Sequence, residues 1–109
     1  MSIKTPREFF EKTLPEKFDS SKAAGIDMVV QLNISGDNGG DWYISIKDQK
    51  MDIKEGLHPE PKVTVQMKDR DWVKMINGEL SGERAYMAGK LILIGDVAEA
   101  LSLRDIGIL

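Results

Sequence analysis

The segment 77–96 limits what this chain can fold into and what chemistry it can perform. It begins with a short helical stretch that carries Tyr86 and Met87 and ends at Gly89, and an apolar strand then runs to Gly95. Nothing in the segment can act as a nucleophile, a metal cluster or a phosphate loop. Its chemistry is that of apolar surface held in shape by glycines, which favours a binding cavity over a catalytic centre.

The composition of the chain is that of an ordinary globular domain. Its 109 residues fit one domain over residues 1–109, with 41% hydrophobic and 30% charged residues. The formal net charge is −3, and lysines and arginines are scattered among acids, so the basic stripe of a nucleic-acid binder is missing. The absence of cysteine excludes disulfides, thiol catalysis and thiolate metal sites.

The two ends of the sequence and its apolar runs bear on location. No apolar run approaches the roughly 18 residues of a membrane-spanning helix. The first residues lack the apolar core of a secretory signal, and the sequence ends in Gly107-Ile108-Leu109, which is no Ser-Lys-Leu-type peroxisomal address. We therefore expect a cytoplasmic domain of prokaryotic type.

Helix signals occur at both ends of the chain. Thr5 and Pro6 form a good helix start, and Pro15 ends or restarts that helix. A second helix carries Trp72, the helix of segment 77–96 follows it, and Asp96 is placed to cap a last helix.

Alternation of apolar and polar residues predicts the strands between these helices. It runs through residues 28–34, 42–46 and 51–53, which read as an antiparallel meander with a tight turn at 48–49. A fourth strand covers residues 63–67, and the strand after Gly89 is the fifth. The pattern predicts an α+β domain with helices mostly on one face of the sheet.

The order and spacing of these elements resemble the sterol carrier protein 2 (SCP-2) family of lipid-transfer domains. The run Tyr86-Met87-Ala88-Gly89-Lys90-Leu91 and the strand end Gly95-Asp96 are similar to that family's aromatic-Met-x-Gly-Lys-Leu segment and to its Gly-Asp strand end. The stretch 61–72 is similar to its strand-then-helix stretch. The resemblance spans roughly the whole chain and implies a five-stranded, mainly antiparallel sheet with helices on one face enclosing an apolar cavity. The strand order comes from the resemblance alone.

The resemblance implies non-enzymatic binding or transfer of a fatty acid, a fatty acyl-CoA or a sterol-like lipid. Aromatic, methionine and leucine side chains are the candidates to line the cavity, since methionine adapts to variable ligands. The same side chains suit an ordinary core, and sequence does not separate the two uses. The alternative is an accessory or scaffold domain of the same fold that acts through protein–protein contacts. The candidate lipid-binding residues are Phe9, Phe10, Phe18, Trp72, Ile76, Tyr86, Met87, Leu91, Leu93 and Leu101.

Catalysis has little support in the sequence. His58 is the only histidine, and it lies in an expected exposed loop without a partner or an orienting group. The acid pairs Asp69/Asp71 and Glu79/Glu83 lie where helices are expected to begin, so capping explains them better than paired-carboxylate chemistry. We therefore expect no enzyme, no metal and no cofactor, and a lipid as the main partner.

Two surfaces are candidates for further contacts. The first helix could rest on an anionic membrane, although core packing is the better explanation of its apolar stripe, and its flanking cations are Lys4, Arg7, Lys12 and Lys17. In the fifth strand Ile92 and Ile94 should face outward, where relatives tend to have lysine. A second copy packed face to face, giving a homodimer, or the segment 103–109 folded back would cover this patch.

Overall fold

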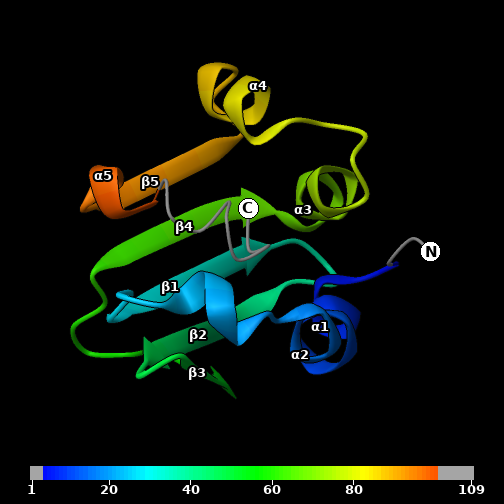
Figure 1. The fold of residues 1–109 in the computed structure, drawn as a ribbon. Helices are drawn as coiled ribbons and strands as arrows, with labels where there is room; N and C mark the ends of the chain where they lie inside the picture. Colours follow the sequence, from blue (N-terminus) through cyan, green and yellow to red (C-terminus); the bar gives the residue numbers. More distant parts are fainter. Residues whose placement is uncertain (1–3, 101–109) are drawn as a thin grey trace.

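The computed structural model describes residues 4–100, which form an α+β domain built on one five-stranded sheet (Figure 1). The strand order is β3-β2-β1-β4-β5, and only the pair β1/β4 is parallel. This confirms the predicted fold class and the mainly antiparallel sheet. The strands are β1 (Met28–Ser35), β2 (Gly40–Lys47), β3 (Lys50–Glu55), β4 (Val63–Lys68) and β5 (Leu91–Gly95).

The first helical segment is continuous but not regular. It consists of α1 (Pro6–Glu8), the π-helical η1 (Phe9–Thr13) and α2 (Leu14–Lys17). The Thr5 hydroxyl accepts a hydrogen bond from the Glu8 N–H at 3.3 Å, so the predicted cap forms. Pro15 has no N–H for the carbonyl four residues before it, and the helix passes this point with a π turn, in which the Leu14 N–H bonds to the Phe9 carbonyl. Pro15 thus restarts the helix and does not end it.

The remaining helices are short: the 3₁₀ helix η2 (Ser20–Ala23), α3 (Asp69–Ile76), α4 (Gly82–Met87) and α5 (Val97–Ala100). The Asp96 carboxylate accepts the Glu99 N–H at 3.2 Å, which confirms the predicted cap of the last helix. The expected cap by Asp69 or Asp71 is wrong, because Lys68 occupies that position. Asp69 instead accepts the Asn38 N–H at 3.0 Å and ties the β1–β2 loop to α3.

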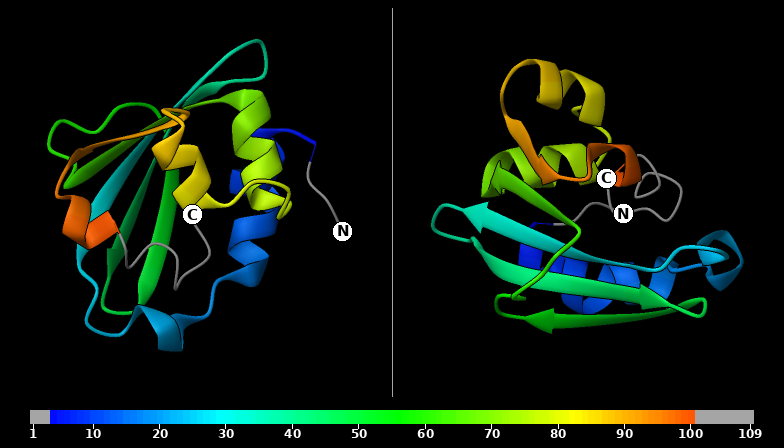
Figure 2. Two further views of the ribbon diagram at one scale, coloured as in Figure 1. Left: turned by 90° about the horizontal axis from the view of Figure 1, so that it is seen from above. Right: turned by 90° about the vertical axis from the view of Figure 1, so that its left-hand side faces the viewer.

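The two faces of the sheet differ in polarity. The helices α1, α2, α3 and α4 lie on one side of it, as Figure 2 shows from two directions. On that inner face the strands β1, β2 and β4 bury every second side chain. The outer face is mainly polar, and Gln31 on it is buried because the loop after β3 crosses there. Its amide donates to the carbonyls of Trp42 and Gly56 and accepts the His58 N–H.

Candidate binding site

The centre of the inner face is a solid cluster of aromatic rings. Phe10 stacks on Trp42 at 4.8 Å and on Trp72 at 5.5 Å between ring centroids, and Phe9 meets Trp72 edge-on at 5.8 Å. All four rings are buried. The cluster fills the core where the first helical segment crosses the sheet, and two of its rings, Phe10 and Trp42, also line the neighbouring groove.

Beside this cluster, a groove opens between the first helical segment and strands β2 and β3. We call it the apolar groove. Its volume is about 430 Å³, within the range of about 300–1,000 Å³ that is usual for small-molecule sites. Six of its residues are apolar, and two acids stand at its rim. The lining residues are Phe10, Glu11, Pro15, Phe18, Trp42, Met51, Ile53 and Glu55.

The π turn sets the shape of this groove. Residues 9–13 are wound with one extra residue per turn, which brings both Phe9 and Phe10 into the core. Leu14 is buried on the same side, and Pro15 reaches the groove wall. Such π turns recur at functional sites, because they place side chains that a regular helix would point elsewhere.

An ion-pair network closes one end of the groove. The Arg7 guanidinium donates to both carboxylate oxygens of Glu55, at 2.9 and 3.1 Å, and to Glu11 at 3.1 Å. These hydrogen bonds lower the pKa of Glu55 and raise that of Arg7. Arg7 also lies 5.6 Å from the centre of the Trp42 ring. The rim therefore carries two carboxylates around one cation, and all three are exposed to solvent.

The structure separates the candidate residues into distinct places. Phe10 and Phe18 line the apolar groove, whereas Phe9 and Trp72 are sealed in the core. Leu91 is buried, and Ile76 and Leu93 are partly buried against the core. Leu101 lies outside the described residues.

Tyr86 and Met87 stand apart from the other candidates. They are 52% and 84% exposed at the end of α4, whose only buried residue is Ala85. Neither is among the residues that line the apolar groove. The two residues belong to one apolar motif in the sequence, but a six-residue helix buries only one narrow side.

Three apolar residues of β2 and β3 line the groove but are not among the ten candidates: Trp42, Met51 and Ile53. A signal for them was present, because the alternation in residues 42–46 and 51–53 already puts all three on one face of the meander. The observed register confirms this arrangement, with Ile44 opposite Ile53 and Ile46 opposite Met51. What sequence did not show is that the first helix crosses that particular part of the face.

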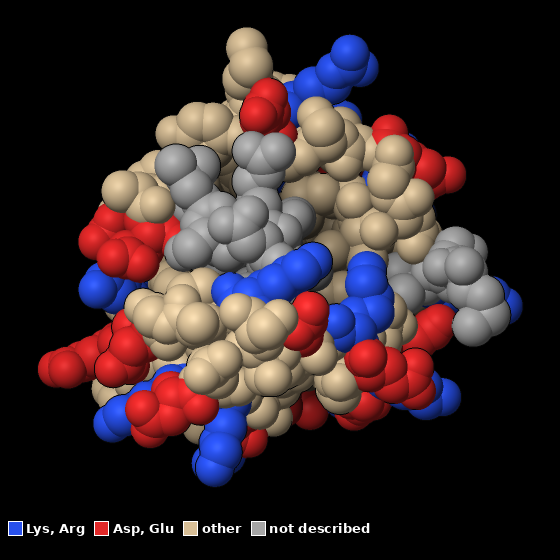
Figure 3. Space-filling view, viewed as in Figure 1, with Lys and Arg blue, Asp and Glu red and all other residues tan. Residues whose placement is uncertain are grey.

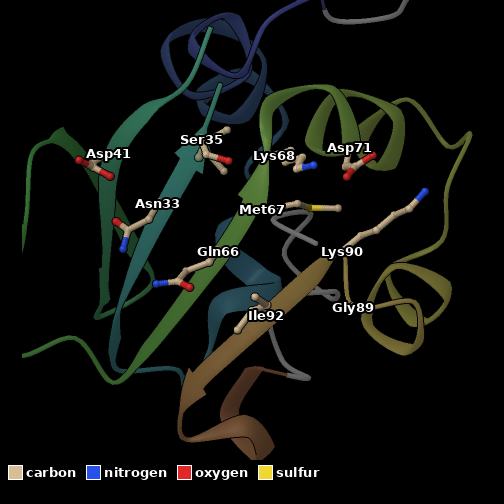
Figure 4. A pocket seen from close by; sticks show the side chains of 11 residues that line it. Asn33, Ser35, Asp41, Gln66, Met67, Lys68, Asp71, Gly89, Lys90 and Ile92 are labelled. Carbon is tan, nitrogen blue, oxygen red and sulfur yellow. The ribbon is translucent and has the colours of Figure 1, made fainter. Parts of the chain in front are cut away.

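A second and larger hollow lies on the outer face (Figure 4). Its volume is about 550 Å³, and polar side chains from β1, β2, β4 and the start of α3 predominate in it. Asn33 and Gln66 lie side by side in adjacent strands, with Ile92 next in the same row. The hollow is lined by Asn33, Ile34, Ser35, Asp41, Gln66, Met67, Lys68, Asp71, Gly89, Lys90 and Ile92.

The described residues hold no metal-binding cluster, and the one histidine of the chain belongs to a loop structure. Residues 4–100 hold no group of three potential metal ligands, and no helix there is long and apolar enough to cross a membrane. His58 is half-buried, contrary to the exposed position expected for it, and its ring meets Tyr43 edge-on at 5.3 Å. Its Nδ1 accepts the Glu60 N–H, which makes it part of a loop structure.

The apolar side of the first helix faces inward. Phe9, Phe10 and Leu14 are all at most 1% exposed, so core packing accounts for this stripe. A membrane contact through these side chains would require the helix to leave the sheet.

Comparisons with known proteins agree on one family. The model of the SCP-2 sterol transfer family matches residues 9–106. Hydroxysteroid dehydrogenase-like protein 2 of Danio rerio is 34% identical over 76 residues, which cover 69% of this chain and 18% of that protein. The chain thus spans less than a fifth of the length of this curated relative.

Solved structures show the same fold. Palmitated SCP2L2 from Aedes aegypti has a TM-score of 0.61 at 27% identity, over 87% of this chain and 93% of that one. The sec-alkylsulfatase Pisa1 from Pseudomonas sp. has a TM-score of 0.77 at 22% identity, over 94% of this chain but only 16% of the sulfatase. The same domain shape therefore occurs both alone and within larger enzymes.

Proposed function

This chain belongs to the SCP-2 sterol transfer family, and we propose that it binds one long-chain lipid in the apolar groove beside β2 and β3. The family and its solved members support lipid binding and transfer as the general function. The ligand class we propose is a fatty acid, a fatty acyl-CoA or a sterol-like lipid. The observation that carries the proposal is a groove with six apolar lining residues in a domain whose described residues hold no metal-binding cluster.

The size and lining of the groove suit an acyl chain. Burying about sixteen CH₂ groups at roughly 0.8 kcal/mol each gives about 13 kcal/mol before the costs of association. Those costs are about 4–15 kcal/mol, so moderate affinity in the micromolar range is expected. Met51 can change rotamer to follow different chains, which favours a broad ligand range over a single lipid.

The rim makes a prediction about the polar end of the ligand. Arg7 already pairs with Glu11 and Glu55, so a ligand carboxylate must displace one of them to bind it. Such an exchange gains little, because exposed ion pairs contribute at most about 1 kcal/mol. We therefore expect the chain to determine affinity and the head group to stay in water. A fatty acid and the matching alcohol should therefore have Kd values within about tenfold of each other, because a difference of about 1 kcal/mol in binding free energy is less than a tenfold difference in Kd.

Among the residues predicted from sequence, we propose Phe10 and Phe18 as direct lipid contacts, joined by Trp42, Met51 and Ile53. Phe9 and Trp72 hold the position of Phe10, since both rings pack against it. Ile76, Leu91 and Leu93 lie elsewhere in the core and support the fold.

A titration with a fluorescent long-chain fatty acid tests the proposal, and two methionines make a matched pair. Met51→Asp puts a charge in the groove, whereas Met87→Asp makes the same change on an exposed side chain of α4. We expect saturable binding by the parent protein. Its affinity for the fatty acid should fall at least tenfold in Met51→Asp and stay unchanged in Met87→Asp. No saturation up to about 100 μM contradicts lipid binding, and the opposite order of the two variants places the lipid at α4.

A second candidate function has one observation in its favour. The relative from Danio rerio has this domain as 18% of its length, so the fold also serves as part of larger proteins. An accessory or scaffold domain would act through contacts with a neighbouring protein. Mass spectrometry of a solvent extract of the purified protein separates the candidates, because a carrier retains lipid at close to one molecule per chain and a scaffold does not.

A further inference from the structure

Exposed apolar side chains are concentrated at one edge of the molecule. The described residues include six large hydrophobic residues that are exposed, and five of them fall within residues 86–97. These five lie on α4, β5 and the start of α5. In Figure 3 charged side chains are sparser over α4 and β5 than over the first helical segment and β3. The five are Tyr86, Met87, Ile92, Ile94 and Val97, and the sixth is Leu57.

The strand β5 forms this edge of the sheet. Its sequence from Leu91 to Gly95 contains no charge and no proline, and it pairs only with β4 among the described strands. Exposed edge strands normally carry charges, prolines or bulges that prevent pairing with another chain. Ile92 and Ile94 are about half exposed on the outer face, as the alternation predicted. This edge is therefore suited to accept another strand.

Face-to-face packing of two outer faces is not favoured by the rest of that face. Beside Ile94 and Ile92 in the sheet stand Thr64 and Gln66. Further across the face, the loop held by Gln31 projects from the sheet. The apolar surface is a narrow strip along β5, which fits a contact between edges and not between broad faces.

We infer that a second copy of this chain pairs with the first through β5, antiparallel and centred on Leu93, so that two five-stranded sheets become one of ten strands. In this register Ile92 lies opposite Ile94 of the second copy, and the reverse pair repeats it across the two-fold axis. Lys90 lies opposite Asp96 of the second copy, also twice. Leu93 meets its own copy on the inner face, where it is only partly buried in the single chain.

Other symmetric registers are poorer. A register centred between two residues is excluded, because it places inner side chains opposite outer ones. The nearest registers that keep inner side chains opposite inner ones are centred on Ile92 or on Ile94. A centre at Ile92 sets Ile94 against Lys90, and a centre at Ile94 sets Ile92 against Asp96. Only the Leu93 register gives two isoleucine pairs and two opposite-charge pairs. Directly opposite pairs of these kinds stabilise strand pairing.

The charged groups are available for this contact. Lys90 is exposed and belongs to no ion pair within residues 4–100. Asp96 is exposed too, and its Oδ1 accepts the Glu99 N–H, which leaves Oδ2 for a cation. Because the contact uses neither the apolar groove nor its rim, this inference stands independently of lipid binding.

Sedimentation velocity over about 5–200 μM tests the inference with charge exchange. The parent should show a concentration-dependent dimer. Lys90→Glu should raise the dimer Kd at least about tenfold, because like charges then face each other. Asp96→Lys should do the same, and Asp96→Asn, which retains a capping side chain, should weaken the dimer less. The double variant Lys90→Glu, Asp96→Lys should restore the dimer, since the exchanged charges again face each other.

The control is Lys50→Glu on β3, the opposite edge of the sheet, which should leave the dimer unchanged. A parent that stays monomeric at 200 μM overturns the inference, and so does a dimer that the double exchange fails to restore. If the monomer binds anionic phosphatidylserine vesicles and loses that binding in Ile92→Ser, Ile94→Ser, the strip is a membrane contact and the inference is wrong.

Discussion

The two edges of the sheet use apolar residues in opposite ways. At the β3 edge Met51 and Ile53 face inward to the apolar groove, and the outward positions are Lys50, Asp52 and Lys54. At the β5 edge apolar residues occupy both faces. The β3 edge therefore has an apolar groove on its inner face and charged side chains on its outer face. The β5 edge leaves apolar surface exposed for contact with another molecule. The lipid site and the dimer contact that we propose therefore lie at opposite edges of the sheet.

The largest contrast should appear in stability. Trp72→Ala removes a fully buried ring from the aromatic cluster and should destabilise the protein by about 3–5 kcal/mol. Tyr86→Ala, on the half-exposed α4, should cost less than about 1 kcal/mol. Urea unfolding followed by tryptophan fluorescence, with Trp42 as the remaining reporter in Trp72→Ala, measures both.

Trp72→Phe serves as the control for that comparison. The Trp72 indole N–H has no partner among the described residues, so phenylalanine keeps most of the packing and loses no hydrogen bond. Equal costs for Trp72→Ala and Tyr86→Ala would mean that the β5 side is packed as firmly as the aromatic cluster.

Lipid should raise the melting temperature of the protein, and this shift should depend on residues at the β3 edge and not on residues at the β5 edge. At a lipid concentration of about 100 times Kd, binding adds about 2.7 kcal/mol to the free energy of unfolding, which is roughly 10–15 °C in melting temperature for a domain of this size. Met51→Asp should abolish the shift, whereas Ile94→Lys should retain it. Differential scanning calorimetry with and without lipid measures the shift in both variants. Loss of the shift in Ile94→Lys alone would place the lipid at the β5 edge instead of the β3 edge.

A smaller effect is expected at the turn that joins β2 to β3. Asp48 and Gln49 have φ of 53° and 62°, which is the left-handed region that glycine adopts without strain. Gln49→Gly should stabilise the protein by about 0.5 kcal/mol, the relief of strain being partly offset by the added freedom of the unfolded chain. Thermal unfolding detects the gain. A loss would show that the hydrogen bond from the Gln49 amide to the Ser20 carbonyl matters more than the strain.

The smallest effect concerns the ion pairs at the groove rim. Arg7 lowers the pKa of Glu55, so this pair stabilises the fold above the unfolded pKa of Glu55 and loses that contribution as the pH falls through the lower, folded value. Glu55→Gln should therefore flatten the decline of stability below about pH 4.3. Urea midpoints from pH 6 to pH 3 show this at low salt. An unchanged decline would assign the acid sensitivity to other carboxylates.

Alternation was enough to predict the strands and their buried face, because every second side chain of β1, β2 and β4 is buried, whereas the strand order came from the family resemblance. Sequence analysis also predicted the caps at Thr5 and Asp96, which depend only on local spacing. It failed for the cap of α3, where Asp69 is used by Asn38 from a distant loop. Long-range contacts of this kind leave no local signal.

The site was predicted less well for a similar reason. Phe10 and Phe18 were identified, but Met51 and Ile53 were not, because the groove forms only where the first helical segment crosses β2 and β3. Tyr86 and Met87 belong to the family motif and are predicted to line the cavity, yet neither lines the apolar groove or the outer-face hollow. Motif membership indicates the fold, whereas a lining position depends on how the elements pack.

The assignment of lipid to the β3 side is the central claim, and photolabelling tests it most directly. A fatty acid with a terminal diazirine is bound, irradiated and mapped by peptide mass spectrometry, with unlabelled fatty acid as competitor. We predict competitor-sensitive labels on Phe18, Met51 and Ile53. Labels confined to residues 86–97, or labels that competitor does not reduce, would contradict the claim.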